Sequence, residues 1–345
     1  VKGIVEEIDA SKYSAALAEV LDQLTESGFE LSAIAAVGHR VVHGGALFSK
    51  PTLVNAEVIA GIKSLVPLAP LHNPANLLGI EALAELLPDT PQVAVFDTAF
   101  HTSIPDFAST YAIPREVTAE FGIRRYGFHG TSHQYVTKQT AKFLGQSVEE
   151  TNIIICHIGN GGSVTAVRNG KSVDTSMGLT PLEGLVMGTR SGDIDPGVLF
   201  HLARVAEYSI ADLDKLLNRE SGMLGLSGMS DMREVWAAVA AGDASAKAAI
   251  EIYNYRIQKY VSAYLGVVPN VQAVVFTAGV GENDEGVRAG ALKPLAHLGI
   301  ELDSELNHAR SRQDRVISTP TSKIKVLVIA TNEELEIAEQ TAALL

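Results

Sequence analysis

The chain has 345 residues, of which 46% are hydrophobic and 19% charged, a balance that predicts a globular protein with room for two core-forming domains. Acidic residues outnumber basic ones by 40 to 27, and the net charge of -13 argues against binding to nucleic acid, which needs clustered positive charge. The single cysteine, Cys156, excludes an internal disulfide framework and suits a reducing compartment, so a cytoplasmic location is expected. No stretch has the length and apolar character of a membrane span, and no membrane partner is expected.

Helix and strand patterns alternate along the chain. Apolar residues at helical spacing from Tyr13 to Leu24 predict a first helix, and Gly28 lies where its C-terminal stop belongs. Runs of β-branched and apolar residues predict buried strands at 35–42, 92–96, 152–158, 271–277 and 325–329. Asn169-Gly170 predicts a type I′ hairpin between 163–167 and 172–175, and the segment 246–265 predicts a long amphipathic helix. The order of elements predicts a mixed α/β fold.

Two glycine-containing segments follow predicted strands, where open α/β sheets bind their ligands. In HIGNGGS (157–163), successive backbone N–H groups can hold a phosphate, and Asn160 and Ser163 can add side-chain hydrogen bonds. An ordinary tight turn is the alternative. In VFTAGVGEN (275–283), the glycines leave room for a flat ring or a ribose. Neither segment has the spacing of a Walker loop or a dinucleotide fingerprint, so we interpret them as two turns that grip a nucleotide.

Two arginines have unusual sequence surroundings. Arg190 lies among small and turn residues, MGTRSGDIDPG (187–197), from which its guanidinium can be aimed at a phosphoryl oxygen. Asp193 and Asp195 are candidates to hold it, and a salt bridge with such neighbours is the alternative role. Arg40 lies inside an apolar predicted strand, where a buried guanidinium needs a partner or an anion. A carboxylate clamp and a structural ion pair are the two interpretations of Arg40.

Other polar side chains are placed at the ends of predicted strands and helices. Asp97 ends one strand, and His129 leads from a glycine turn into a helix. His129 and His133 have a metal-ligand spacing, but the glutamate of the zincin motif is missing, which favours hydrogen-bonded roles. Asn332 or its neighbour Thr331 can cap the last helix, where Glu333 is either an ordinary first-turn carboxylate or a magnesium ligand.

Six motifs occur in a fixed order over essentially the whole chain: GHRVVHGG, LAPLHNP, FDTAFH, YGFHGTSH, GLTPLEGLVMGTRSGDIDPG and TNEEL. In this order they resemble the acetate kinase family of the acetate and sugar kinase/Hsp70/actin superfamily. The resemblance implies a two-lobed actin/Hsp70-like ATPase fold with mixed sheets flanked by helices. The first lobe, residues 1–97 and 333–345, would face the carboxylate substrate. The second lobe, residues 98–332, would bind the nucleotide and form a homodimer.

The resemblance also implies an activity and a role for individual residues. The activity is reversible transfer of the γ-phosphoryl group of ATP to acetate, giving acetyl phosphate and ADP, with Mg²⁺ or Mn²⁺ as cofactor. Arg40 would contact the carboxylate, and the methyl pocket would be lined by Val42, Leu71, Phe128 and Pro181. Arg190 and His129 would stabilise the transferring phosphoryl group, Asp97 would be the essential acidic residue and Glu333 would belong to the metal shell. The nucleotide would be held by three segments: His157, Ile158, Gly159, Asn160, Gly161 and Ser163; Asp231, Met232 and Arg233; Gly279, Val280, Gly281, Glu282 and Asn283.

The chemistry of the substrate sets an expectation for the mechanism. A carboxylate has a pKa of roughly 4 and is ionised near neutrality, so it needs no general base to attack phosphorus. Asp97 is therefore expected to orient a magnesium-bound water or an arginine. Repulsion between the acid and the triphosphate opposes the reaction, and Arg40 and Arg190 are expected to cancel it from the two lobes, together with Mg²⁺ and a protonated His129. We expect direct in-line transfer.

One part of the family pattern is absent, and two other functions remain open. The family begins with a strand and an Asn-x-Gly-Ser-Ser-Ser loop that grips phosphate, so the first lobe is expected to lack its N-terminal strands. Either a segment precedes Val1 in the intact protein or this chain is a remnant, which we would expect to be unstable and nearly inactive. The alternatives are a propionate kinase, which differs by one methylene of pocket, and a non-catalytic actin/Hsp70-like nucleotide switch.

Overall fold

The computed structural model describes residues 13–345, which form two compact units. The first contains the described residues up to Thr102 together with Asn332–Leu345, and the second is Ser103–Thr331. The assignment of the carboxylate to one unit and of the nucleotide to the other stays a prediction. In the described part of the chain, no helix is long and apolar enough to cross a membrane.

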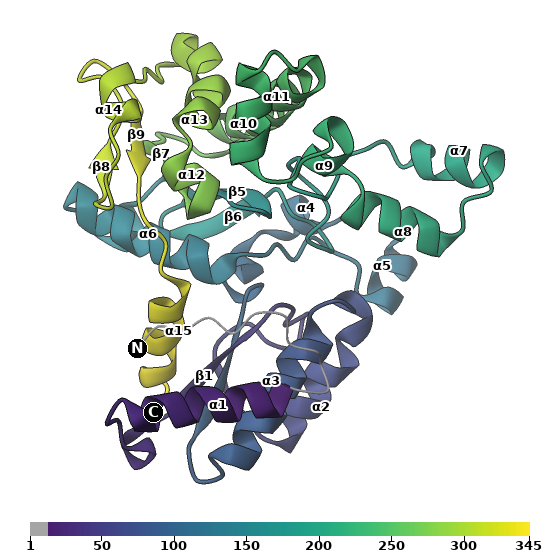
Figure 1. The fold of residues 1–345 in the computed structure, drawn as a ribbon, viewed down its shortest axis with the longest axis vertical. Helices are drawn as coiled ribbons and strands as arrows, with labels where there is room; N and C mark the ends of the chain where they lie inside the picture. The colour runs from purple at the N-terminus through teal and green to yellow at the C-terminus, as the bar shows by residue number, and fades with distance from the viewer. Residues whose placement is uncertain (1–12) are drawn as a thin grey trace. The chain divides into compact units, whose positions relative to one another are not determined.

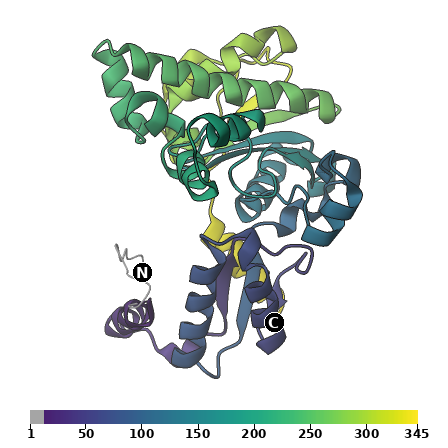
Figure 2. The same ribbon diagram turned by 90° about the vertical axis from the view of Figure 1, so that its right-hand side faces the viewer.

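The first unit is a three-stranded sheet flanked by helices. β1 (Val37–Val41) runs parallel to β3 (Gln92–Phe96), which pairs antiparallel with β2 (Thr52–Leu53). The helices are α1 (Tyr13–Glu26), α2 (Ala56–Ser64), α3 (Asn73–Leu86) and α15 (Glu333–Ala342), with 3-10 turns at Leu31–Ala33, Val66–Leu68 and Ala99–Ser103. The C-terminal helix α15, yellow in Figures 1 and 2, returns to pack on β1 and β3 of this unit.

The alternation of side chains along β1 decides which residues enter the core of the first unit. Val41 packs with Phe96, Ile62 and other apolar residues of α2 and α3. Gly38 lies on the other face, where an added Cβ would be 2.6 Å from Ile337 of α15. Arg40 shares that face with Gly38 because it lies two residues further along the strand. The start of α15 is therefore brought to the side of the sheet that carries the arginine.

The second unit contains a six-stranded mixed sheet in the order β6-β5-β4-β7-β9-β8. Its strands are β4 (Ile153–Ile158), β5 (Gly162–Arg168), β6 (Lys171–Thr175), β7 (Ala273–Thr277), β8 (Arg315–Val316) and β9 (Lys325–Val328). The pairs β4–β7 and β7–β9 are parallel, and the other pairs are antiparallel. The helices are α4 (Asp106–Ser109), α5 (Arg115–Phe121), α6 (Gly130–Leu144), α7 (Gly197–Val205), α8 (Ile210–Arg219), α9 (Gly222–Ser227), α10 (Met232–Ala240), α11 (Ala244–Val267), α12 (Ala278–Asn283), α13 (Glu285–Leu292) and α14 (Ser304–His308), with 3-10 turns at Val148–Glu150 and Lys293–Leu298.

Different helices cover the two faces of the second sheet, as Figure 1 shows for α6 and α11. Cys156 and Ile158 of β4 belong to the apolar core that includes Ile257 of α11. His157 points to the opposite face, where its Nδ1 lies 2.8 Å from the Ser132 Oγ of α6. Since β4 and β7 are parallel neighbours, their carboxyl ends meet at one edge of the sheet. The segments that follow these two strands therefore start side by side.

The mixed α/β fold is confirmed, and the predicted strands occur at nearly the predicted positions. The hairpin is confirmed too, with φ angles of 51° at Asn169 and 72° at Gly170. The prediction of a simple glycine turn after β7 was wrong, because residues 278–283 form the short helix α12. The sharp change of direction is taken by Ala278, at φ 65°, and not by a glycine. The Glu282 side chain accepts a hydrogen bond from the Ala278 N–H at 2.9 Å, which ties the helix to its own start.

Candidate active site

Arg40 and Asp97 form an ion pair at the carboxyl ends of β1 and β3. The Arg40 guanidinium donates from Nε to both Asp97 oxygens, at 3.0 and 3.1 Å, and from Nη2 to Oδ2 at 2.7 Å. The prediction that Arg40 is buried was wrong, because its side chain is 43% exposed whereas that of Asp97 is 1% exposed. The Asp97 carboxylate raises the pKa of Arg40. Arg40 thus presents a permanently charged guanidinium, which the buried Asp97 carboxylate orients.

Glu333 lies next to this ion pair at the start of α15. The predicted cap is confirmed, since the Asn332 side chain accepts a hydrogen bond from the Leu335 N–H at 3.0 Å. Burial raises the pKa of Glu333, and the charge of Arg40 partly opposes that shift. The buried Glu333 Oε1 has no hydrogen-bond partner within residues 13–345. An oxygen of this kind suits a hard divalent cation.

The carboxylates of the described residues fit a cation that is held only partly by the protein. Among residues 13–345, no group of three or more His, Cys, Asp or Glu side chains could hold a metal ion. Mg²⁺ is typically bound through one or two carboxylates plus substrate phosphates and water, so a complete protein cage is not required. Glu333 is the side chain that fits this role, and the neighbouring Asp97 is already engaged by Arg40.

The residues expected to line the methyl pocket are distributed over both units. In the first unit, Val42 is 8% exposed and its N–H donates to the Asn76 side chain at 3.1 Å, whereas Leu71 is 51% exposed. In the second unit, Phe128 is 1% exposed and Pro181 is half-buried. Their grouping into one pocket stays a prediction.

Arg190 is a largely buried arginine in the loop before α7. Its Nη1 donates to the Pro181 carbonyl oxygen at 2.8 Å, and no carboxylate of the described residues lies within ion-pair distance of it. Burial lowers the pKa of Arg190, because no nearby acid offsets the desolvation of its charge. Such a guanidinium attracts an anion, and its planar fork matches the oxygens of a phosphoryl group.

The prediction that Asp193 and Asp195 hold Arg190 was wrong. Asp193 Oδ1 accepts from the Gly184 N–H at 2.8 Å, and its Oδ2 accepts from the Tyr260 hydroxyl of α11 at 2.7 Å. Asp195 accepts from the backbone N–H of Gly197 at 2.9 Å. These aspartates therefore hold the loop that carries Arg190 and not the guanidinium itself. The sequence alone could not reveal Tyr260, which lies far along the chain.

Two histidines lie beside the turn that joins β4 and β5. His129, with φ 56°, precedes α6, and its ring stacks on that of His157 with 4.2 Å between the centroids. An added Cβ at Gly161 would lie 2.6 Å from Arg190 Nη2 and 3.5 Å from His129 Nε2. The guanidinium and the imidazole thus approach the same backbone position, and the glycine is needed there for lack of space. This arrangement can place two cationic or hydrogen-bonding groups around one anion.

Ser163 occupies the space between two imidazoles. Its Oγ lies 2.9 Å from His129 Nδ1 and 2.8 Å from His133 Nε2, and the residue is fully buried. His129 and His133, four residues apart, therefore share the Ser163 hydroxyl as a hydrogen-bond partner. The role of Ser163 in phosphate binding stays a prediction.

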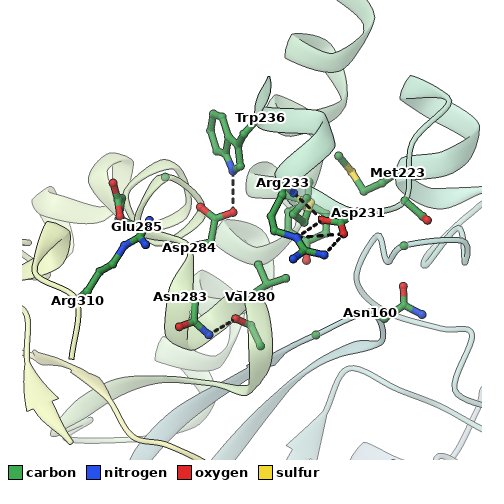
Figure 3. Close-up of a pocket in the computed structure, with 17 residues that line it drawn as sticks. Asn160, Met223, Asp231, Arg233, Trp236, Val280, Asn283, Asp284, Glu285 and Arg310 are labelled. Carbon is green, nitrogen blue, oxygen red and sulfur yellow. Dashed lines mark hydrogen bonds and ion pairs between the residues drawn. The ribbon is translucent and has the colours of Figure 1, made fainter. Parts of the chain in front are cut away.

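A cavity of about 980 Å³ lies between α9, α10, α12 and the turn after β4 (Figure 3). Eight of the residues expected to bind the nucleotide line it: Gly159, Asn160, Asp231, Met232, Arg233, Gly279, Val280 and Asn283. Six others lie outside its lining: His157, Ile158, Gly161, Ser163, Gly281 and Glu282. Of the latter, the Glu282 carboxylate accepts hydrogen bonds from the N–H groups of Ala278 and Thr331, at 2.9 and 3.1 Å, and joins the ends of β7 and β9.

Several lining residues were not predicted from the sequence: Gly188, Met223, Ser230, Trp236, Tyr253, Asp284, Glu285, Gly286 and Arg310. Trp236, the only tryptophan, donates from its indole N–H to Asp284 Oδ2 at 2.7 Å, a bond visible in Figure 3. A further wall is formed by Asp231, whose carboxylate accepts from the Arg233 Nε at 3.0 Å. This contact with Arg233 lowers the pKa of Asp231 to about 2. The cavity therefore combines aromatic side chains, Trp236 and Tyr253, with ionised groups at its edge.

The comparisons with known proteins agree over nearly the whole chain. The model of the acetokinase family matches residues 2–339. An acetate kinase from Streptomyces avermitilis is 54% identical over 334 residues, which is 96% of this chain and 82% of that protein. A crystal structure of Porphyromonas gingivalis acetate kinase superposes with a TM-score of 0.91 at 45% identity, covering 96% of this chain and 84% of the other. A crystal structure of a propionate kinase from Francisella tularensis subsp. tularensis SCHU S4 gives 0.92 at 47% identity, with coverages of 96% and 85%.

The family model spans both units, and the ion pair at Arg40, the buried Arg190 and the cavity all lie within the matched residues. The chain belongs to the acetokinase family.

Proposed function

We propose that this chain is an acetate kinase, which transfers the γ-phosphoryl group of ATP to acetate and gives acetyl phosphate and ADP in a reversible reaction. The first unit takes the carboxylate through Arg40, and the second takes the nucleotide in the cavity lined by Trp236 and Val280. The identity of 54% to a curated acetate kinase over 96% of the chain supports the assignment of the reaction.

The observation that carries the proposal is that Arg190 is largely buried and has no acidic partner among the described residues. Its guanidinium is desolvated, lacks an acidic partner among the described residues and lies against Gly161 together with His129. A group in this state is poised for the equatorial oxygens of a transferring phosphoryl group, where an arginine typically contributes 10³-fold or more to the rate. The alternative role for Arg190, a structural salt bridge, is not supported, because no carboxylate of the described residues pairs with it.

The ion pair at Arg40 supports a mechanism without a general base. A carboxylate substrate is ionised at neutral pH, so no proton has to be removed before it attacks phosphorus. Asp97 is fully engaged with the Arg40 guanidinium, which suits a residue that orients the arginine. We propose that Asp97 holds Arg40 toward the substrate carboxylate, and that the attack occurs in line with the leaving ADP.

The proposed cofactor is Mg²⁺, with Mn²⁺ as a substitute, and Glu333 is the residue that would hold it. A divalent cation supplies charge compensation on the phosphates of ATP. The buried, unpartnered Oε1 of Glu333 supports this assignment. Arg40, next to it, limits the negative charge that accumulates on this side of the first unit when no cation is bound.

The test is a coupled assay that compares acetate, propionate, butyrate and water as phosphoryl acceptors. We expect turnover with acetate at least as fast as with propionate and negligible ATP hydrolysis with water alone. Turnover with water at the rate found with acetate would contradict the proposal and favour a nucleotide switch. Inversion at a chiral γ-phosphate is expected for a single displacement, and net retention would refute it.

A propionate kinase is the second candidate, favoured by the close match to the Francisella protein. The substrates differ by one methylene, which is worth about 1–3 kcal/mol in an apolar pocket. The same assay separates the two candidates, since a propionate kinase would show the larger kcat/KM with propionate.

We also propose that the protein is a homodimer formed through the second unit. The helices α7 and α8 contain no buried residue, and Phe200 and Ile210 are 61% and 87% exposed. Light scattering is expected to give twice the mass of the chain, and a Phe200→Lys, Ile210→Lys variant is expected to be monomeric. The matched control is Leu47→Lys, at a 60% exposed position of the first unit. A monomeric parent protein would overturn this proposal.

A further inference from the structure

The second unit contains a fully buried arginine that the proposed reaction does not use. Arg288 of α13 is 1% exposed and is the bulkiest fully buried side chain of the described residues. No carboxylate in residues 13–345 lies within ion-pair distance of it, and burial lowers its pKa to about 10. A buried arginine without an acidic partner is costly, so its hydrogen bonds must hold something that the fold requires.

The Arg288 guanidinium is shared between two segments. Its Nη1 donates to the carbonyl oxygens of Gly281 and Glu282, both at 2.9 Å, in the last turn of α12. Its Nε donates to Asn307 Oδ1 at 2.7 Å, and its Nη2 donates to the Asn307 carbonyl oxygen at 2.8 Å. Asn307 is itself fixed by a bond from its Nδ2 to the Glu285 carbonyl oxygen at 3.0 Å. Asn307 therefore fixes one side of the guanidinium, and the other side donates to the carbonyl groups at the end of α12.

The helix that Arg288 grips is too short to be stable by itself. α12 has six residues, and a helix of this length forms too few internal hydrogen bonds to offset the entropy of ordering its backbone. The last carbonyl groups of a helix lack partners within it, and a positive charge at that end is favourable. Arg288 satisfies two of those carbonyls, while the Glu282 carboxylate binds the Ala278 N–H at the other end. α12 is thus fixed from both ends by side chains.

The residues that α12 carries line the cavity. Gly279, Val280 and Asn283 belong to its wall, and the last two are seen facing it in Figure 3. Asn283 is also bound back to α12, since its Nδ2 donates to the Gly279 carbonyl oxygen at 2.8 Å. Any rotation or fraying of α12 would move all three of these residues together. The side chain that fixes α12 therefore controls the shape of the wall without touching the cavity.

We propose that Arg288 is a positioning residue for the nucleotide, which acts by clamping the C-terminal turn of α12 so that Gly279, Val280 and Asn283 form a preorganised wall. The inference rests on the proposed function in one respect, namely that the cavity binds the nucleotide. It assigns Arg288 an effect on nucleotide affinity and none on the carboxylate or on the transfer step.

The experiment compares Arg288→Met, which keeps much of the packing but removes every hydrogen bond, with Leu292→Ala as a matched control. Leu292 is fully buried in the same helix α13, so its truncation lowers stability without removing a polar contact to α12. Binding of ADP is followed through the emission of Trp236, the single tryptophan, which lines the cavity. Steady-state kinetics give KM for ATP, KM for acetate and kcat, and thermal unfolding gives Tm.

We expect Arg288→Met to raise the ADP dissociation constant and the KM for ATP by roughly tenfold or more, since charge-assisted hydrogen bonds to α12 are lost. The KM for acetate and kcat at saturating ATP are expected to stay within about twofold, because the affected wall holds only the nucleotide. Leu292→Ala is expected to lower Tm with little change in either nucleotide constant. Arg288→Lys keeps the charge but cannot span both segments, and it is expected to show an intermediate rise in KM for ATP.

The inference is overturned if Arg288→Met changes the nucleotide constants no more than Leu292→Ala does. It is equally overturned if kcat and the KM for acetate change as much as the KM for ATP. Where Arg288→Met does not fold, Arg288→Lys replaces it in the same comparison with the same criteria. A parent protein whose Trp236 emission does not respond to ADP would instead refute nucleotide binding in the cavity, and so the proposed function itself.

Discussion

The close approach of Arg190 to Gly161 makes Gly161→Ala a sensitive probe of the phosphoryl site. The new Cβ would lie 2.6 Å from Arg190 Nη2, and an ordinary contact begins at 3.4 Å, so the guanidinium must move by roughly 0.8 Å. The group is planar and rigid, and its Nη1 is bound to the Pro181 carbonyl oxygen at 2.8 Å. It can move away from residue 161 only by straining or breaking that bond.

The expected consequence is a loss of turnover that is larger than any loss of binding. A misplacement of about 1 Å at a catalytic group can lower the rate by on the order of 100-fold, so we expect kcat to fall by roughly 10- to 100-fold. Gly161 does not line the cavity, and the affinity for ADP, measured through Trp236 emission, is expected to stay within about twofold. The assay is steady-state turnover with acetate and ATP, both at saturation.

Gly266→Ala provides the matched control, because nothing lies within 4 Å of a Cβ added there. Gly266 is in the long helix α11, where alanine is favoured over glycine by roughly 1 kcal/mol, so this variant is expected to be as active as the parent and no less stable. If Gly161→Ala and Gly266→Ala have the same kcat, the position of the Arg190 guanidinium does not limit the reaction, and the role assigned to it is wrong.

Three further changes test other parts of the site. Arg40→Lys loses the bidentate contact with Asp97 and is expected to lower kcat/KM for acetate by roughly 10- to 100-fold at an unchanged KM for ATP. An unchanged kcat/KM for acetate would exclude the carboxylate clamp. Tyr260→Phe removes the bond to Asp193 and is expected to lower kcat more than either KM; a change confined to Tm would limit Tyr260 to stability. Glu333→Gln removes a carboxyl group whose pKa is raised by burial above 4.5, so the parent loses stability relative to the variant as pH rises through that region. We expect the variant to have the higher Tm at pH 7, the difference to vanish below about pH 4 and activity with Mg²⁺ to be reduced; equal Tm values at pH 7 would contradict the assigned burial cost.

The sequence by itself determined the elements whose formation depends on neighbouring residues. The segment 92–96, apolar at every position after Gln92, forms β3 with the predicted bounds, because a strand buried on both faces needs apolar side chains at nearly every position. Asn169 and Gly170 tolerate positive φ, and they form the predicted hairpin. Asn332 caps α15 as expected, since capping requires only a side-chain acceptor near the first turn. Such interactions are local, and the residues that make them are adjacent in the sequence.

The order of the six motifs also determined the family, and with it eight of the 17 residues that line the cavity. Asp231, Arg233 and Val280 are examples, although they come from segments that are far apart in the chain. By contrast, Trp236 and Asp284 line the same cavity and were not predicted. In the sequence, Trp236 resembles an ordinary residue of an amphipathic helix and Asp284 resembles an ordinary helix N-cap. Only the packing of α10 beside the start of α13 brings the two side chains to a common space.

Only the tertiary structure decided which side chains are partners. Arg40 is partly exposed at the end of its strand, whereas its partner Asp97, 57 residues away, is buried. The apolar neighbours of Arg40 in the sequence cannot reveal which member of the pair is buried. Asp193 lies three residues from Arg190 but binds Gly184 within the loop and Tyr260, 67 residues away, because the loop is folded against α11. Arg288 has the sequence surroundings of a solvated helix position, yet it is fully buried. Local propensity fixes where a helix or strand begins and ends, whereas the partner of a charged group depends on which distant segments the core brings together.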